Sequence, residues 1–131
     1  MIYYPPIDEV IAIHDRMVKK YGGREGVFDF ALMHSAIERP KATFGGKELY
    51  PTIFDKAAAM IHSLIQNHPF ADGNKRTALA ITVRFLHLNG YKLIHPTKET
   101  IDFALRIQKK KTTFEQISSW LRKHSKKIHL L

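Results

Sequence analysis

The side chains best suited to chemistry lie within one short stretch of the sequence, from His68 to Arg76. Histidine transfers protons near neutral pH more readily than other side chains, so His68 is a candidate general base. Asp72 offers oxygen atoms of the kind that hold Mg²⁺ beside nucleotide phosphates. Gly73 lets the backbone approach a phosphate closely, and the donors of the run Asn74 to Arg76 suit the same group. Together they are the components of phosphoryl or nucleotidyl transfer.

Lys75 and Arg76 stand where cations are unfavourable. The residues that follow predict a helix over 74–88, apolar on almost every side and therefore central and buried, with Asn89-Gly90 closing it. Unpaired N–H groups make a helix N-terminus positive, so two exposed cations there cost roughly 0.3–1 kcal/mol each. A bound anion would remove that cost, and helix N-termini beside a glycine bind phosphate.

Each of these residues also has a purely structural interpretation. A histidine at a helix end is structural more often than catalytic, and Asp72 can serve as an N-cap or turn residue. Lys75 and Arg76 can extend along the surface. Together these interpretations leave two cations in the first helical turn unexplained. Phe70, within the same stretch, is expected to be buried under the turn as its anchor.

Helices on both sides must position this stretch. Apolar residues at helical spacing predict a helix over 7–21, on whose apolar face His14 is expected to be a core residue. Asp29 is a plausible N-cap for a short helix that Pro40 ends. Paired glycines indicate a loop or small hairpin near residues 42–48. A helix with Pro51 in its first turn then delivers His68 at its C-terminal end.

The remaining elements complete a compact domain. Residues 91–94 are expected to be extended, Thr97 to cap a helix over about 98–109, and Thr112 with Glu115 to form the capping box of a last helix. The sequence has no internal repeat, long linker or low-complexity tract. We therefore predict one all-α domain spanning residues 1–131, with about six helices.

Charge is unevenly distributed along the chain. Of the net charge of +9, residues 92–131 carry +7, from 10 basic and 3 acidic side chains. Such a region suggests an acidic partner or nucleic acid, or simply a solvated helical face. No recognition-helix motif or aromatic-rich groove accompanies the charge, so nucleic acid is not expected as the direct target. The absence of cysteine, of a signal segment and of a membrane-length apolar run predicts a cytoplasmic protein without membrane contact.

The stretch His68-Pro69-Phe70-Ala71-Asp72-Gly73-Asn74-Lys75-Arg76 resembles the signature loop of Fic-domain proteins, H-x-F-x-[DE]-[GA]-N-x-R. Lys75, followed by Thr77-Ala78-Leu79, resembles the death-on-curing (Doc) branch of that family. Further similarities lie between the first helix and Tyr91. They are Tyr21-Gly22-Gly23, Arg39-Pro40, Thr43-Phe44-Gly45-Gly46, Leu49-Tyr50-Pro51 and Leu88-Asn89-Gly90-Tyr91.

The resemblance implies an all-α Fic-like fold and transfer from a nucleoside triphosphate to a protein hydroxyl. His68 would deprotonate the target and Asp72 would help to hold Mg²⁺. Gly73, Asn74 and Arg76 would bind phosphates. Thr43, Phe44, Gly45 and Gly46 would lie in or beside a flap that aligns the target by strand addition.

Two positions depart from the nucleotidylating Fic enzymes, which have glycine at the position of Lys75 and a second arginine at that of Leu79. In the Doc branch these changes accompany phosphorylation of translation elongation factor Tu, with ATP as donor, and growth arrest. The sequence lacks the family's self-inhibitory motif, Ser/Thr-x-x-x-Glu-Gly/Asn, so a small Phd-like antitoxin acting in trans is expected. The alternatives are a Fic-type protein adenylyltransferase and an inactive basic module that binds an acidic partner or nucleic acid.

Overall fold

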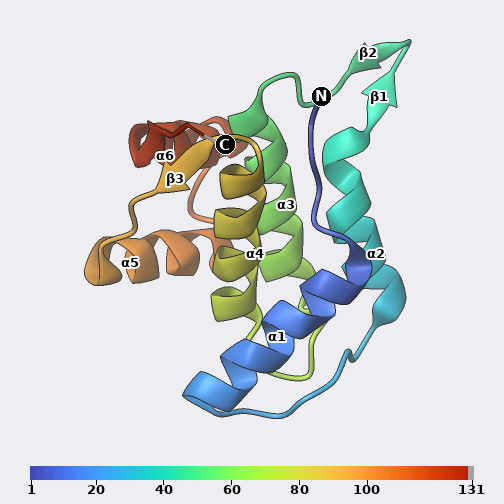
Figure 1. The fold of residues 1–131 in the computed structure, drawn as a ribbon, viewed down its shortest axis with the longest axis vertical. Coiled ribbons are helices and arrows are strands. Elements are labelled where there is room, and N and C mark those ends of the chain that lie inside the picture. The colour runs from blue at the N-terminus through green and yellow to red at the C-terminus, as the bar shows by residue number, and fades with distance from the viewer. Residues whose placement is uncertain (130–131) are drawn as a thin grey trace.

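The computed structural model describes residues 1–129. Six α-helices dominate these residues, which confirms the predicted all-α class (Figure 1). The helices are α1 (Ile7–Tyr21), α2 (Phe30–Glu38), α3 (Ile53–Asn67), α4 (Asn74–Leu88), α5 (Thr97–Gln108) and α6 (Phe114–Lys123). The shorter elements are the 3-10 helix η1 (Arg39–Lys41) and the strands β1 (Thr43–Phe44), β2 (Lys47–Glu48), β3 (Tyr91–Leu93) and β4 (Ser125–Lys127).

The central helix is α3, whereas the sequence pattern predicted α4. α3 packs against α2, α4, α5 and α6, and ten of its residues are buried. α4 is fully buried on one face only, because Leu79, Ala80 and Val83 line a partly open hollow beside α1 and α5. Apolar content shows that a helix can be buried, but it does not show which neighbours cover it.

Several predicted helix boundaries are confirmed. α1 spans the predicted residues, and the backbone N–H of Gly22 closes it by donating to the carbonyl of Val18 (2.7 Å). Asp29 caps α2, since its carboxylate accepts from the backbone N–H of Leu32 (3.0 Å). α4 likewise begins at Asn74, directly after Gly73.

Other helix starts differ from the prediction. Pro51 lies just before α3, where Thr52 is the N-cap and forms a capping box with Asp55. Thr97 is the first residue of α5 rather than its cap, a position that Pro96 occupies. Proline fixes its own backbone angle, which suits it to a position just outside a helix as well as to the first turn.

The capping box of α6 is displaced by one residue from the predicted one. It pairs Thr113 with Gln116, and both reciprocal hydrogen bonds are present. The predicted pair, Thr112 and Glu115, has the same spacing and equally suitable residue types. Spacing alone therefore could not choose between the two overlapping pairs.

The predicted small hairpin is present. β1 and β2 pair antiparallel, with Thr43 opposite Glu48 and Phe44 opposite Lys47. Gly45 and Gly46 connect them with φ of 59° and 79°. Two consecutive positive φ angles are what a tight hairpin turn requires, and glycine adopts them without strain.

A second two-stranded sheet was not predicted. β3 pairs antiparallel with β4, so that Tyr91 lies opposite Lys127 and Leu93 opposite Ser125. Residues 91–94 were expected to be extended, and β3 confirms this, but the sequence did not predict β4 or its pairing with β3. β4 follows the last helix by one residue and is short and basic, and no alternation of apolar residues marks it as a strand.

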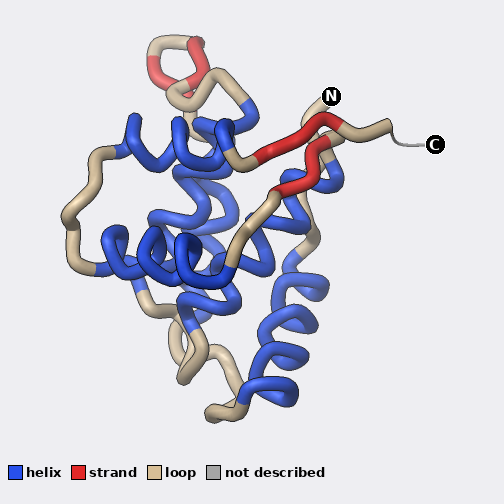
Figure 2. The backbone as a smooth tube through the Cα atoms, turned by 90° about the vertical axis from the view of Figure 1, so that its left-hand side faces the viewer, coloured by secondary structure: helices blue, strands red, loops and turns tan. Residues whose placement is uncertain are grey.

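The loop between α3 and α4 and the β1–β2 hairpin lie at opposite ends of the molecule (Figures 1 and 2). The chain leaves the hairpin, runs the length of α3 and reaches the loop, and α4 then returns alongside α3. None of the helices in residues 1–129 is long and apolar enough to cross a membrane.

Candidate functional site

The loop that carries His68 is closed by hydrogen bonds of its own residues. The side chain of Asn74 accepts from the backbone N–H of Phe70 (3.0 Å) and donates to the carbonyl of the same residue (3.1 Å). His68 itself caps α3 in the left-handed conformation, with φ of 48°. Left-handed backbone is unusual for histidine, and Pro69 prevents α3 from continuing past it. The loop therefore holds His68 at a sharp turn with its side chain exposed.

Phe70 anchors this loop in the core. Its side chain is buried and stacks on the ring of His14, with ring centroids 4.2 Å apart and planes 9° from parallel. His14 is a buried core residue of α1, as expected, but it also contacts the loop directly. Its Nε2 lies 2.9 Å from the backbone carbonyl of Asp72, to which it donates. Sequence analysis did not reveal this contact, because 58 residues separate the two positions.

A second support comes from the segment after α1. The backbone N–H groups of Phe28 and Asp29 both donate to the carbonyl of Pro69, at 2.8 and 2.9 Å. The N–H of Ala71 in turn donates to the carbonyl of Gly26 (3.2 Å). These bonds join main-chain atoms only, so no side-chain pattern in the sequence could have indicated them.

The Asp72 side chain lies against the backbone of the same segment. Its carboxylate accepts from the N–H of Gly73 (3.1 Å) and lies 3.4 Å from the N–H of Arg24. A Cβ on Gly23 would come within 3.2 Å of three atoms of Asp72. Gly23 has a φ of 117°, so both space and backbone conformation favour glycine there. The carboxylate is exposed.

The predicted residues His68, Asp72, Gly73, Asn74, Lys75 and Arg76 together line one hollow of about 390 Å³. α4 begins at this hollow, and the backbone N–H groups of its first residues have no acceptor within residues 1–129. The guanidinium of Arg76 lies over the ring of Tyr21, 4.4 Å from its centroid, and Lys75 is exposed. The hollow thus combines a helix N-terminus and two cations, which suit a phosphate group, with a carboxylate and an imidazole.

The hollow can hold a magnesium ion only with help from a ligand. Residues 1–129 contain no cluster of three or more histidine, cysteine, aspartate or glutamate side chains that could bind a metal alone. Asp72 is the one carboxylate among the residues lining the hollow. Mg²⁺ is commonly bound by one or two carboxylates together with substrate phosphates and water, and this arrangement fits Asp72 beside an anion site.

The residues predicted to align a target, Thr43, Phe44, Gly45 and Gly46, do not line this hollow. They form the exposed tip of the β1–β2 hairpin, where the side chain of Phe44 is 83% exposed. The 15 residues of α3 separate the hairpin from His68, a helix length of about 22 Å. The structure therefore places the hairpin away from the loop, and it gives no support to a role beside His68.

Comparison with known proteins finds a matching family and two similar proteins. Residues 4–86 match the Fic/DOC family. Over 73 residues the chain is 49% identical to Toxin Doc of Mycolicibacterium smegmatis, a match that covers 56% of each protein. Over 86 residues it is 34% identical to Protein kinase doc of Escherichia phage P1, covering 66% of this chain and 68% of the phage protein. The match thus spans little more than half the length of the mycobacterial relative.

Proposed function

Because the chain belongs to the Fic/DOC family, we propose that it is a Doc-like toxin that transfers the γ-phosphate of ATP to a hydroxyl group of a protein. The relatives named Toxin Doc and Protein kinase doc support this proposal. The main structural support for this proposal is the hollow at the N-terminal end of α4, which His68 and Asp72 line. The proposed base and the proposed phosphate site lie together there, on a loop that Phe70 anchors in the core.

The proposed reaction assigns a separate task to each group. His68 takes the proton from the target hydroxyl, whose oxygen forms a bond to the γ-phosphorus, while the bond to the bridging oxygen of ADP breaks. The N–H groups at the start of α4, with Lys75 and Arg76, bind the phosphate oxygens. Mg²⁺, when bound with ATP, neutralises phosphate charge, and Asp72 is the side chain placed to hold it. The Asn74 side chain holds the loop through its two hydrogen bonds to the backbone of Phe70, and the second hydrogen of its amide can donate to a phosphate oxygen.

Two residues favour phosphoryl over adenylyl transfer. Leu79 lines a neighbouring apolar hollow and offers no charge to a phosphate. Lys75 adds a cation at the helix N-terminus, where nucleotidylating Fic enzymes have glycine. The shared loop keeps adenylyl transfer as the alternative reaction, and an inactive basic module as the second alternative.

We further propose translation elongation factor Tu as the target and a Phd-like antitoxin as the inhibitor in trans. A hollow of about 510 Å³ between α1, α4 and α5 is open to such a partner. It is lined by apolar side chains that include Met17, Val83 and Ile101, and it shares Arg76 with the catalytic hollow. A segment bound there would lie against a phosphate-binding residue, so it could block ATP.

Transfer of a radioactive label from ATP to protein distinguishes a phosphotransferase, an adenylyltransferase and an inactive module. The protein is incubated with Mg²⁺ and ATP labelled at either the α or the γ position, with purified elongation factor Tu or with cell lysate. We expect label on protein from γ-labelled ATP only. Label from α-labelled ATP would show adenylyl transfer instead, and no label from either would support the inactive module.

A matched pair of histidine variants tests the role of His68. His68→Ala should lower transfer by about 10²–10⁴-fold, the range for loss of a general base. His34→Ala, at an exposed position of α2, removes an equivalent side chain away from the hollow and should leave transfer unchanged. Retained transfer in His68→Ala would rule out this residue as the base.

A further inference from the structure

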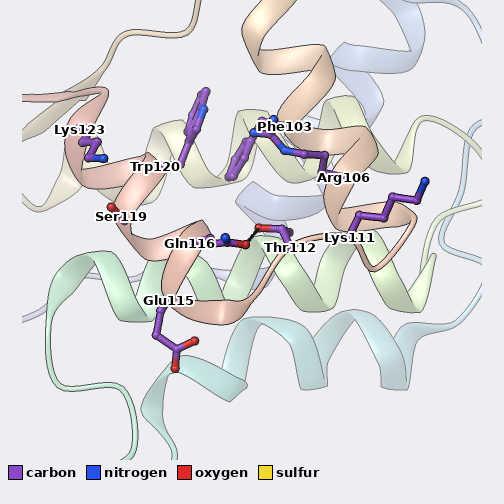
Figure 3. A pocket seen from close by; sticks show the side chains of 9 residues that line it. All are labelled: Phe103, Arg106, Lys111, Thr112, Glu115, Gln116, Ser119, Trp120 and Lys123. Atoms are coloured by element: carbon purple, nitrogen blue, oxygen red, sulfur yellow. Dashed lines mark hydrogen bonds between the residues drawn. The ribbon is translucent and has the colours of Figure 1, made fainter.

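A second hollow, of about 490 Å³, lies between α5 and α6 in the basic C-terminal region (Figure 3). We call it the α5–α6 cleft. It is built from residues 103–123, which follow the end of the family match at residue 86. The transfer chemistry proposed above uses none of these residues.

Stacked rings form a rigid wall of the α5–α6 cleft. Phe103 and Trp120 lie nearly parallel, with centroids 3.9 Å apart and planes 6° from parallel. The ring of His124 stacks on Trp120 at 3.8 Å. Phe103 is buried, whereas Trp120 is half-buried and lines the cleft. Half-buried tryptophan in a fixed position is typical of residues that contribute strongly to protein binding.

Cations stand at both ends of this wall. Figure 3 shows Lys123 on one side of Trp120 and Arg106 and Lys111 on the other. None of these three side chains forms an ion pair with any residue between 1 and 129. The single acidic residue of the lining, Glu115, points away from the other labelled side chains in Figure 3. The cleft is therefore positively charged, and its cations are available to a ligand.

The stacking decides which anionic partner the cleft suits. Single-stranded nucleic acid binds by placing bases on exposed aromatic faces. Here Phe103 and His124 both stack on Trp120, so its faces are occupied. Aromatic edges carry partial positive charge and accept contact with carboxylates and apolar side chains. A short acidic polypeptide with an apolar residue between its carboxylates matches this combination.

We propose that the α5–α6 cleft is a docking site for an acidic polypeptide segment, bound through Arg106, Lys111 and Lys123 around the edge of Trp120. The chain contains one tryptophan, so intrinsic fluorescence reports on this cleft directly. The probe is the synthetic peptide acetyl-Glu-Asp-Leu-Glu-Asp-Phe-Glu-amide, titrated into the full chain at about 0.1 M salt. We expect a saturable change in Trp120 emission.

Two double variants with equal charge change make the test specific. Arg106→Gln with Lys123→Gln should weaken peptide binding roughly tenfold, the loss of two partly screened ion pairs. Lys126→Gln with Lys127→Gln removes the same charge from exposed positions of β4 outside the cleft, and should bind nearly as well as the parent protein. Circular dichroism checks that both variants fold.

Three results would overturn the proposal. They are no saturable change with the peptide, equal weakening in both double variants, or tighter binding of a short single-stranded oligothymidylate than of the peptide. The last result would identify a nucleic-acid surface instead. None of these readouts depends on transfer activity, so failure of the proposed function would leave this test unaffected.

Discussion

At the scale of single residues, His14 links α1 to the loop that carries His68 and Asp72. It stacks on Phe70 and donates to the carbonyl of Asp72, and both contacts reach the same short loop. It is absent from the lining of the hollow, so it can act on the reaction only by positioning other residues. A substitution that keeps the ring contact with Phe70 and removes the hydrogen bond to Asp72 separates the effects of these two contacts.

The first prediction concerns His14→Phe, which preserves an aromatic ring against Phe70 and removes the donor to Asp72. We expect the free energy of unfolding to fall by about 1 kcal/mol, the typical net value of one hydrogen bond. The KM for ATP should rise more than kcat falls, because a displaced Asp72 affects binding first. Calorimetry and steady-state kinetics measure the two effects. An unchanged KM would show that the contact stabilises the fold only.

The second prediction concerns Asp72→Asn, which keeps an oxygen that can accept from Gly73 and loses the negative charge. Transfer should weaken, and excess Mg²⁺ should partly restore it, because a neutral amide is a poorer magnesium ligand. Activity measured across a magnesium titration tests this. The matched control is Asp102→Asn, at an exposed position of α5. Full activity of Asp72→Asn with a chelator present would exclude the metal role.

The third prediction concerns the two cations at the start of α4. Lys75 is exposed at a positive helix end, so Lys75→Ala should leave the unliganded protein equally stable or about 0.3–1 kcal/mol more stable. Arg76 also lies over Tyr21, a contact worth about 0.5–1 kcal/mol. Loss of that contact offsets the relief at the helix end, so Arg76→Ala should be nearly neutral.

Melting with Mg²⁺-ATP should show whether Lys75 and Arg76 bind the nucleotide or only stabilise the fold. Both alanine variants should lower transfer, and both should shrink the rise in Tm that Mg²⁺-ATP gives the parent protein, because ligand that binds only the folded state stabilises it. Thermal melting with and without nucleotide measures this. If both variants melt several degrees lower without nucleotide, both side chains stabilise the fold, and the predicted cost of two cations at this helix N-terminus is wrong.

At the scale of elements, the start of α3 connects three parts of the fold. Thr52 and Asp55 form the capping box there, and the Asp55 carboxylate also accepts from the hydroxyl of Ser118 in α6 (2.8 Å). Nearby, the buried side chain of Lys56 donates to Glu48 of β2 and to the carbonyl of Tyr50. One helical turn therefore holds α6 and the hairpin against the central helix.

The fourth prediction is that Thr52→Ala lowers the free energy of unfolding by about 0.5–2 kcal/mol, the usual cost of losing an N-cap. Thr97→Ala is the matched control, since Thr97 is an exposed residue in the first turn of α5 but is not its cap. It should have little effect. Urea unfolding of both variants measures the difference. Equal losses would mean that the capping geometry at α3 contributes nothing specific.

Element boundaries were largely predictable because local rules determine them. α1, Asp29 as the cap of α2, the glycine turn of the hairpin and the start of α4 all follow from residue types within a few positions. The β3–β4 sheet and the central place of α3 could not be predicted, because both depend on contacts between distant segments. At α6 two overlapping capping-box pairs were possible, and the structure forms Thr113 with Gln116 instead of the predicted Thr112 with Glu115.

At the scale of the whole molecule, the hollow lined by His68 and Asp72 depends on residues from distant parts of the chain as well as on those that line it. The six residues that line it lie within nine positions of the sequence, so residues that the sequence analysis grouped together are also neighbours in the structure. Its supports, among them His14, Gly23 and the backbone of Phe28, come from elsewhere in the chain. The distance between hairpin and hollow likewise depends on the direction and length of α3, which residue types do not show.

Two titratable groups make the stability of the whole domain sensitive to acid. Burial, followed by the charges of Arg39 and Lys110, lowers the pKa of His62 below its ordinary 6.5. The Nδ1 of His62 lies 2.9 Å from the Arg39 guanidinium and accepts from it, which requires a neutral ring at that nitrogen. As the pH falls below about 6.5, the unfolded chain binds a proton that the folded protein resists, so stability decreases.

Asp55 acts in a lower pH range. Burial alone would raise its pKa, but hydrogen bonds from Ser118 and Thr52, with the charge of Arg122, outweigh burial and lower the pKa below 3.8. A carboxyl group with a lowered folded pKa stabilises the protein above its unfolded pKa. That stabilisation is lost as the pH falls through the folded value. Both groups therefore make acid destabilising, in two separate windows.

The fifth prediction is that two different substitutions each reduce the pH dependence of the free energy of unfolding in one of these two pH ranges. His62→Asn keeps an acceptor for Arg39 without titrating, so it should reduce the slope of stability against pH just below 6.5 and leave the slope below 3.8 unchanged. Ser118→Ala should do the reverse, because it removes one of the bonds that lower the pKa of Asp55. Urea unfolding measured from about pH 3 to pH 7.5 gives both slopes. If His62→Asn keeps the parent slope near pH 6, another histidine controls this window, and the Arg39 contact does not couple stability to pH.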